Sequence, residues 1–231
     1  MPFDFPLPKF YACPHKKDSR EATIIARYRQ YFGKTLPKDK QYWTMCSMQT
    51  DDKGVFQEGS ELGQMLASGI LTENQFYGVD IMEDFITANR NAKPKAHWLR
   101  NDFEQQMKIA YKEGWFNPAI VFADLLNMTR AGVQTVSNIM CFLEDKNIHN
   151  VMLVANMMIT NPHARRQISE AEAVAKAQGV VDAFGKVPEF KHVWRNDTWK
   201  AHPEYYLYNG SGNKSTTRLV TYIFYKNDYL S

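Results

Sequence analysis

Short apolar runs alternate with amphipathic stretches from Tyr42 onward, and this alternation predicts strands that are separated by helices. The runs at 119–123 and 151–155 contain no polar residue, which is typical of central strands buried on both faces. Strands separated by helices of about 10–15 residues form βαβ units, and such units give a parallel sheet. We therefore expect an α/β fold in which helices cover both faces of a mostly parallel, Rossmann-like sheet.

The same pattern locates the individual elements. The predicted strands are Tyr42–Met48, Gln75–Asp80, His97–Asn101, Ala119–Ala123, Val151–Met158, Phe190–Arg195, Tyr205–Asn209 and Thr217–Lys226. The predicted helices between them are Ser60–Ser68, Met82–Asn91, Phe103–Glu113, Ala131–Asp145 and Ile168–Phe184. After Gly185 only aromatic, β-type segments follow, and turn-forming residues at 209–213 predict an antiparallel hairpin at the C-terminal end.

The N-terminal part differs from the rest of the chain. Residues 1–17 are rich in proline and aromatic residues, and we expect them to form an arm that lies on the domain. Asp18 or Ser19 then caps a helix that runs to about Phe32, with Arg20, Arg27 and Lys34 on one polar face. We therefore divide the chain into an N-terminal arm and helix, 1–40, and a Rossmann-like domain, 41–231.

Composition narrows the classes of protein. With 28 Lys+Arg and 25 Asp+Glu, the net charge of +3 is too small to establish a nucleic-acid partner by itself. The sequence has no apolar run of the ~18–20 residues that span a bilayer, so we expect no membrane segment. We also expect no secretory signal, and the 3 widely spaced cysteines favour a reducing, cytoplasmic compartment. The histidines and cysteines lack the spacing of metal ligands, so we expect no metal site.

Three predicted strands end in an aspartate: Asp80, Asp102 and Asp124. In open α/β sheets, ligands bind outside the carboxyl ends of the strands. An acidic residue at the end of the second strand is able to accept hydrogen bonds from both hydroxyls of a ribose. An aspartate at the next strand end is able to bind an adenine amino group. Three carboxylates along one edge therefore suit a nucleoside-containing cofactor.

The same aspartates also have a purely structural interpretation. Glu83 follows Asp80 by three residues and Gln105 follows Asp102 by three residues, and both spacings are those of capping boxes at helix starts. Capping does not prevent ligand binding, because neighbouring residues are able to form the floor of a pocket. Both interpretations stay open for each aspartate taken alone, and the three together favour the ligand site.

Three stretches resemble class I S-adenosylmethionine-dependent methyltransferases. Residues 75–90, Gln-Phe-Tyr-Gly-Val-Asp-Ile-Met-Glu-Asp-Phe-Ile-Thr-Ala-Asn-Arg, are similar to the second strand and following helix of that family. Residues 97–103, His-Trp-Leu-Arg-Asn-Asp-Phe, are similar to its adenine-binding strand end, and residues 119–125 to its fourth strand. The resemblance extends over about 42–226. It implies a seven-stranded sheet with a C-terminal antiparallel hairpin, and S-adenosyl-L-methionine as cofactor.

The resemblance also implies a set of cofactor-binding residues, although the first turn departs from the family. That turn is usually acidic, Gly-rich and short, and it holds the methionine part of the cofactor. Here it maps to a long segment from Met48 to Glu61, so the segment is either a lengthened lid or the mark of a domain that has lost its cofactor. The implied cofactor-binding residues are Met48, Gly59, Ser60, Glu61, Asp80, Ile81, Asp102, Phe103 and Asp124.

The methyl acceptor is not identified by any motif of the family. The Asp/Asn-Pro-Pro-aromatic motif, the Pro-Cys nucleophile and a lysine in the fifth strand are all missing. Methyl transfer requires mainly positioning and sometimes one base, for which Asp124 and His163 are the candidates. Arg27, Arg165 and Arg166 are candidates for binding a polyanionic acceptor such as nucleic acid, and the alternative for each is a solvated basic face.

Three functions are therefore weighed. The first is an S-adenosylmethionine-dependent methyltransferase. The second is a methyltransferase-like module without catalytic activity that serves as a binding or accessory subunit, which the long first loop favours. The third is an NAD(P)-dependent oxidoreductase, although the chain lacks both the G-x-G-x-x-G turn and a Tyr-x-x-x-Lys pair. The sequence does not indicate an oligomeric state.

Overall fold

The structure is a computed structural model, and it describes residues 14–46, 48–158, 169–184, 200–209 and 218–226. The predicted strand Phe190–Arg195 and the turn at 209–213 lie wholly or largely outside these residues, as do the candidate site residues His163, Arg165 and Arg166.

The elements alternate as the sequence pattern predicts. The strands are β1 (Gln41–Met45), β2 (Phe76–Asp80), β3 (His97–Arg100), β4 (Pro118–Met128), β5 (Val151–Met158), β6 (Lys200–Asn209) and β7 (Arg218–Lys226). The helices are α1 (Pro14–Arg20), α2 (Ala26–Tyr31), α3 (Glu61–Ala67), α4 (Glu83–Ala92), α5 (Phe103–Lys112), α6 (Thr129–Asp145) and α7 (Glu170–Phe184). A π-helical segment, η1 (Glu21–Ile25), joins α1 to α2, and a 3₁₀ turn, η2 (Glu73–Gln75), precedes β2.

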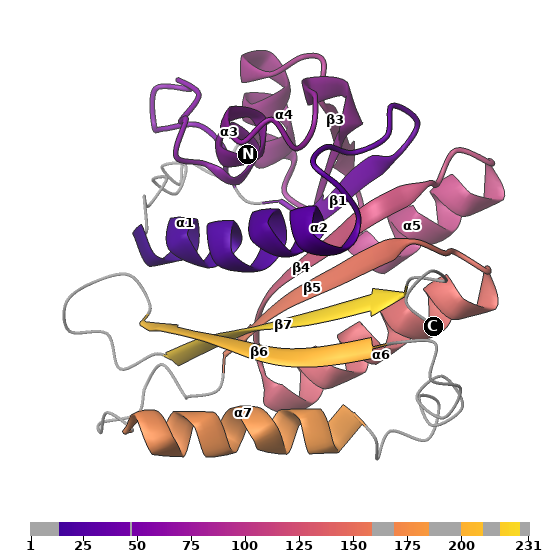
Figure 1. Cartoon of the computed structure of the whole chain (residues 1–231). Coiled ribbons are helices and arrows are strands. Elements are labelled where there is room, and N and C mark those ends of the chain that lie inside the picture. The colour runs from indigo at the N-terminus through magenta and orange to yellow at the C-terminus, as the bar shows by residue number, and fades with distance from the viewer. Residues whose placement is uncertain (1–13, 47, 159–168, 185–199, 210–217, 227–231) are drawn as a thin grey trace, which may run out of the picture.

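The described strands form one sheet in the order β3-β2-β1-β4-β5-β7-β6 (Figure 1). Strands β1 to β5 pair in parallel, so the predicted α/β fold with a mostly parallel sheet is confirmed. Strand β7 is antiparallel to both β5 and β6. The order reverses at β1, which pairs with β2 on one side and β4 on the other. In sheets of this kind, the carboxyl edge at such a reversal is where ligands bind.

Two apolar cores lie on the two faces of the sheet, because successive side chains of a strand point to opposite sides. Tyr42 belongs to the core beneath η1, α2, α3 and α4, which we call the first face. Trp43 belongs to the core beneath α5, α6 and α7, which we call the second face. The apolar runs in β4 and β5 supply buried side chains to both cores, as expected for central strands.

The N-terminal helix differs from its prediction at its start and in its middle. It begins at Pro14, so residues 14–17 are helical and not part of an arm. The π-helical segment adds about one residue to a turn, and this shifts the faces of the helix relative to a regular 3.6-residue period. Arg20 is consequently buried, and the prediction that it shares an exposed polar face with Arg27 is wrong. Ile24, Ile25 and Tyr28 pack in the core of the first face.

Candidate functional site

Four polar side chains lie in a row on the first face, at the carboxyl edge of the sheet. Asp80 ends β2, Cys46 follows β1, and Asp124 in β4 is the register partner of Asn156 in β5. Each lies an even number of residues from a side chain of the first-face core, which places all four on that face. Burial raises the pKa of the Cys46 thiol, and the nearby carboxylates of Asp80 and Glu61 raise it further. The carboxylates of Asp80 and Glu61 therefore both lie near Cys46.

Asp80 occupies a half-buried position at this edge. Its Oδ1 accepts a hydrogen bond from the backbone N–H of Met82 at 2.8 Å, which closes a local turn after β2. Burial raises the pKa of Asp80, and hydrogen bonds from the backbone of Met82 and Ile81 partly offset this. The capping box predicted for Asp80 and Glu83 is wrong, because the N-cap residue of α4 is Met82, which makes no side-chain cap.

Two large apolar side chains lie exposed directly beside Asp80. Ile81 is 67% exposed and Met82 is 48% exposed, and they are among the most exposed large apolar side chains of the described residues. Glu83, the next residue, forms an ion pair with Arg100 at 3.2 Å on the neighbouring strand. The end of β2 thus presents a carboxylate next to an apolar surface, a combination that suits a ligand with hydroxyl groups and a planar apolar ring.

Glu61 is a buried carboxyl that α3 positions above the row. It is 2% exposed, and the hydroxyl of Tyr42 donates a hydrogen bond to its Oε1 at 3.0 Å. Burial raises the pKa of Glu61, the nearby Arg20 lowers it, and the nearby Asp124 raises it. Glu61 is identified as a site residue from the sequence, but Tyr42 and Arg20 are not. Tyr42 lies in an apolar strand, which is typical of a core residue, and the helical periodicity predicts that Arg20 lies on a face exposed to solvent.

Asp124 lies where β4 becomes irregular. Asn156 Nδ2 donates a hydrogen bond to Asp124 Oδ1 at 3.2 Å, which links the ends of the paired segments of β4 and β5. The strand does not end at Asp124 as predicted. It continues to Met128, and the pairing of β4 with β5 shifts in register between Asp124 and Met128.

Asp102 and Phe103 follow β3, the strand that pairs with β2. Asp102 is exposed and caps α5, with its Oδ1 accepting a hydrogen bond from the backbone N–H of Gln105 at 3.0 Å, so the predicted helix cap is confirmed. Phe103 is buried in the core of the second face, where it shares a cluster with Val79 and Met107. Its ring therefore does not lie on the edge as the resemblance implied, because the first turn of α5 directs it into the core.

Residues between β1 and α3 form hydrogen bonds with the backbone N–H groups at the start of α3. Met48 is buried, and Ser60 caps α3 by accepting a hydrogen bond from the backbone N–H of Gly63 at 3.1 Å. The preceding N–H, that of Leu62, donates to Oε1 of Gln49 at 3.0 Å. Gly59 is exposed, with open space where a Cβ would lie. No local pattern in the sequence points to Gln49, because this contact joins two residues that are 13 positions apart.

The remaining predicted residues lie elsewhere. Arg27 in α2 is half-buried and donates a hydrogen bond to Gln30. Among the described residues, no group of three or more histidine, cysteine, aspartate or glutamate side chains is arranged to hold a metal ion. Within the same part of the chain, no helix is both long enough and apolar enough to cross a bilayer.

No family model and no curated protein matches the sequence. Among solved structures, a TehB-like SAM-dependent methyltransferase from Corynebacterium glutamicum aligns over 93% of this chain and 96% of its own, with 11% identity and a TM-score of 0.41. The 16S rRNA methylase ArmA aligns over 90% and 85%, with 14% identity and a TM-score of 0.40. A possible exported protein from Bordetella parapertussis aligns over 90% and 68%, with 11% identity and a TM-score of 0.42.

The fold is defined by the order and direction of the described strands. Five strands run in parallel in the order β3-β2-β1-β4-β5, and an antiparallel β7 lies between β5 and β6. In its fold, the chain is an α/β protein with a Rossmann-like, mostly parallel sheet.

Proposed function

We propose that this chain is an S-adenosylmethionine-dependent methyltransferase that binds the adenosine part of its cofactor at the carboxyl edge of β2. The observation that carries the proposal is the half-buried carboxyl of Asp80, with the exposed side chains of Ile81 and Met82 directly beside it. One oxygen of Asp80 is held by the N–H of Met82, which fixes the direction of the other. Charge-assisted hydrogen bonds from two ribose hydroxyls suit such a fixed carboxylate.

Asp102 has a secondary role in this proposal. It caps α5 through one oxygen and is exposed, so its second oxygen is the group that would accept a hydrogen bond from an adenine amino group. Phe103 supports the site only by anchoring α5 in the core, since its ring is buried.

The residues fit the amino-acid end of the cofactor less well. In the family, that end lies in the turn after the first strand, which here corresponds to the segment from Met48 to Glu61. The N–H groups of Leu62 and Gly63 already donate to Gln49 and Ser60. Gly63 is also packed tightly, because a Cβ there would lie 2.4 Å from the carbonyl oxygen of Glu58. Gly59 and Glu61 remain the candidates on this segment for binding the amino-acid end. The bound cofactor would supply the methyl group that is transferred.

Asp124 is the proposed polar group that faces the transferred methyl, with His163 as a further candidate base. The observation in favour of Asp124 is its position at the carboxyl edge, where it is tied to Asn156 and lies close to Glu61. A carboxylate in such a position orients an acceptor and is able to take up a proton from it.

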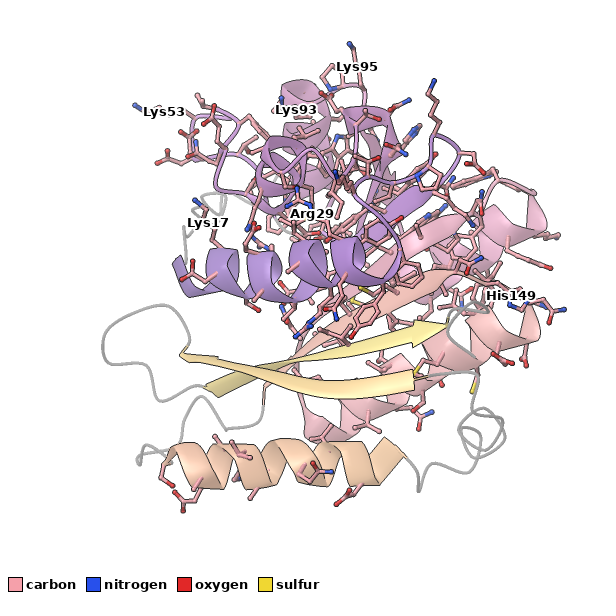
Figure 2. The ribbon with its side chains drawn as sticks, in the orientation of Figure 1. Lys17, Arg29, Lys53, Lys93, Lys95 and His149 are labelled. Atoms are coloured by element: carbon pink, nitrogen blue, oxygen red, sulfur yellow. The ribbon has the colours of Figure 1, made fainter. Side chains whose placement is uncertain are left out.

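The proposed acceptor is a polyanion, with nucleic acid as the leading class. Arg27, Arg165 and Arg166 are the proposed contacts to phosphate groups. Figure 2 shows two further cations, Lys17 on α1 and Lys93 after α4, on the side of the molecule where α3 and α4 lie. Single-stranded RNA and DNA should bind with a strong dependence on salt, and Arg27→Gln should lower the slope of log Kd against log salt by about 1. Anisotropy measurements in which neither strand binds at low salt would contradict a nucleic-acid acceptor.

A second candidate function is a binding or accessory module without catalytic activity. The specific observation that favours it is the Gln49 contact, because it fills hydrogen-bonding capacity that a methyltransferase of this fold uses for its cofactor. An NAD(P)-dependent oxidoreductase is the third candidate, and no contact in the described residues supports it.

Calorimetry with three ligands separates these functions. S-adenosylmethionine and S-adenosylhomocysteine should bind with micromolar or tighter Kd, and NAD should not bind. Uptake of NAD alone would indicate the oxidoreductase, and uptake of none of the three would indicate the accessory module. A subsequent assay with tritiated S-adenosylmethionine and single-stranded RNA or DNA then measures methyl transfer.

A further inference from the structure

The segment from Met48 to Glu58, which we call the 48–58 loop, is a compact unit with a defined closure. Thr50 and Phe56 form an antiparallel bridge, and the N–H of Gln57 donates to the carbonyl oxygen of Gln49 at 2.9 Å. At its tip, Asp51 Oδ1 accepts hydrogen bonds from the N–H groups of Lys53 and Val55. The loop therefore has its own hydrogen-bonded structure and holds Gln49 at its base.

Gln49 is fixed from two sides. Its backbone N–H donates to Asn89 Oδ1 in α4 at 2.8 Å, and its side-chain Oε1 accepts from the N–H of Leu62 in α3 at 3.0 Å. Gln49 is 1% exposed and Asn89 is 0% exposed, so both hydrogen bonds lie away from water. Gln49 thus links the first turn of α3 to the second half of α4, and it lies shortly after Cys46, which follows β1 at the carboxyl edge.

A further contact holds the loop against α4. The ammonium group of Lys93 lies over the ring of Phe56, 4.3 Å from its centroid. Phe56 also packs against the core of the first face. The position of the 48–58 loop against α3 and α4 is therefore stabilised both at Gln49 and at Phe56. Displacing Gln49 requires breaking its buried hydrogen bonds.

We propose that Gln49 tunes the ligand preference of the site: its contact with Leu62 lowers the affinity of adenosine ligands that carry an amino-acid end, S-adenosylmethionine included, and leaves the affinity of those without one unchanged. This inference rests on the proposed function, because it concerns the same site at Asp80. An adenosine ligand that ends at its 5′ carbon requires only the edge near Asp80 and Ile81. A ligand with a homocysteine end must also move Gln49 from Leu62, and the lost buried hydrogen bond lowers its affinity.

The test compares two ligands that differ only in the amino-acid end, 5′-methylthioadenosine and S-adenosylhomocysteine. Gln49→Ala should tighten the binding of S-adenosylhomocysteine about tenfold, which corresponds to roughly one net hydrogen bond. It should leave the Kd of 5′-methylthioadenosine within about twofold. Gln57→Ala is the matched control, because Gln57 lies in the same loop and its side chain donates hydrogen bonds to Asp51 and Val55 within that loop. It should change neither Kd.

Further measurements separate an effect of the Gln49 contact from a failure of the variant to fold. Thermal unfolding establishes that Gln49→Ala is folded, and Asn89→Ala releases the other side of Gln49 and should give the same change in ligand preference. Hydrogen exchange of the Leu62 amide should be slow in the ligand-free wild type and fast in Gln49→Ala. An S-adenosylhomocysteine Kd that is equal in wild type and both variants, while 5′-methylthioadenosine binds, overturns this inference alone. Binding of S-adenosylhomocysteine without any binding of 5′-methylthioadenosine also overturns this inference alone. Failure of both ligands to bind wild type and variants overturns the proposed function and this inference together.

Discussion

The hydroxyl of Tyr42 in β1 donates a hydrogen bond to Oε1 of Glu61 in α3 at 3.0 Å, and both side chains are buried. This contact joins the strand at the centre of the sheet to the helix that begins above its carboxyl edge. It also gives a buried carboxyl a partner, which lowers the cost of removing it from water. The position of α3 relative to Asp80 and Asp124 therefore depends on Glu61.

The buried Glu61 should make stability depend on pH. Burial raises its pKa in the folded chain, and Arg20 offsets only part of that change. A carboxyl whose pKa rises on folding stabilises the fold fully below its unfolded value of about 4.3, and this contribution is lost as the pH rises through the folded value. The wild type should therefore lose free energy of unfolding relative to Glu61→Gln over that range.

Urea unfolding at a series of pH values measures this difference. Glutamine keeps an oxygen that accepts from Tyr42, so the fold should be retained. Curves for wild type and Glu61→Gln that run parallel from pH 4 to pH 8 would be at odds with a raised pKa at this position.

Gly78 in β2 should not tolerate a side chain. A Cβ at this position would lie 2.7 Å from the ring of Trp98 and 3.0 Å from Cβ of Cys46. Overpacking of this kind costs about 1–3 kcal/mol, so Gly78→Ala should lower the free energy of unfolding by that amount. The control is Gly59→Ala, because nothing lies within 4 Å of a Cβ at Gly59. Equal stability of the two variants would show that β2 and β3 are packed differently.

Asp102 allows its two roles to be separated. Serine is also a good N-cap, so Asp102→Ser should retain most of the stability of α5, whereas Asp102→Ala should lose about 1 kcal/mol. If the second oxygen of Asp102 accepts from adenine, the affinity for S-adenosylhomocysteine should fall by about 0.5–1.5 kcal/mol in both variants. Unchanged affinity in Asp102→Ser, measured by calorimetry, would leave Asp102 with the role of a helix cap alone.

The sequence predicted the fold better than the site because the two depend on contacts of different range. The apolar runs of β4 and β5 and the cap at Asp102 are local signals, and the structure has them at the predicted positions. Arg20 was misplaced because the π-helical turn that follows it changes the helical period, and that turn has no simple sequence signature. The contact of Gln49 with Leu62 depends on how a long loop folds back, which no spacing rule describes.

The direct test of the central claim is the affinity of S-adenosylhomocysteine for Asp80→Ala, measured by calorimetry beside the wild type. Loss of the hydrogen bonds to the ribose should weaken binding by about 1–3 kcal/mol. Glu83→Ala is the matched control, because Glu83 lies three residues away in an exposed ion pair with Arg100, and its loss should change binding by less than about 0.5 kcal/mol. A folded Asp80→Ala variant with the affinity of the wild type would contradict the account.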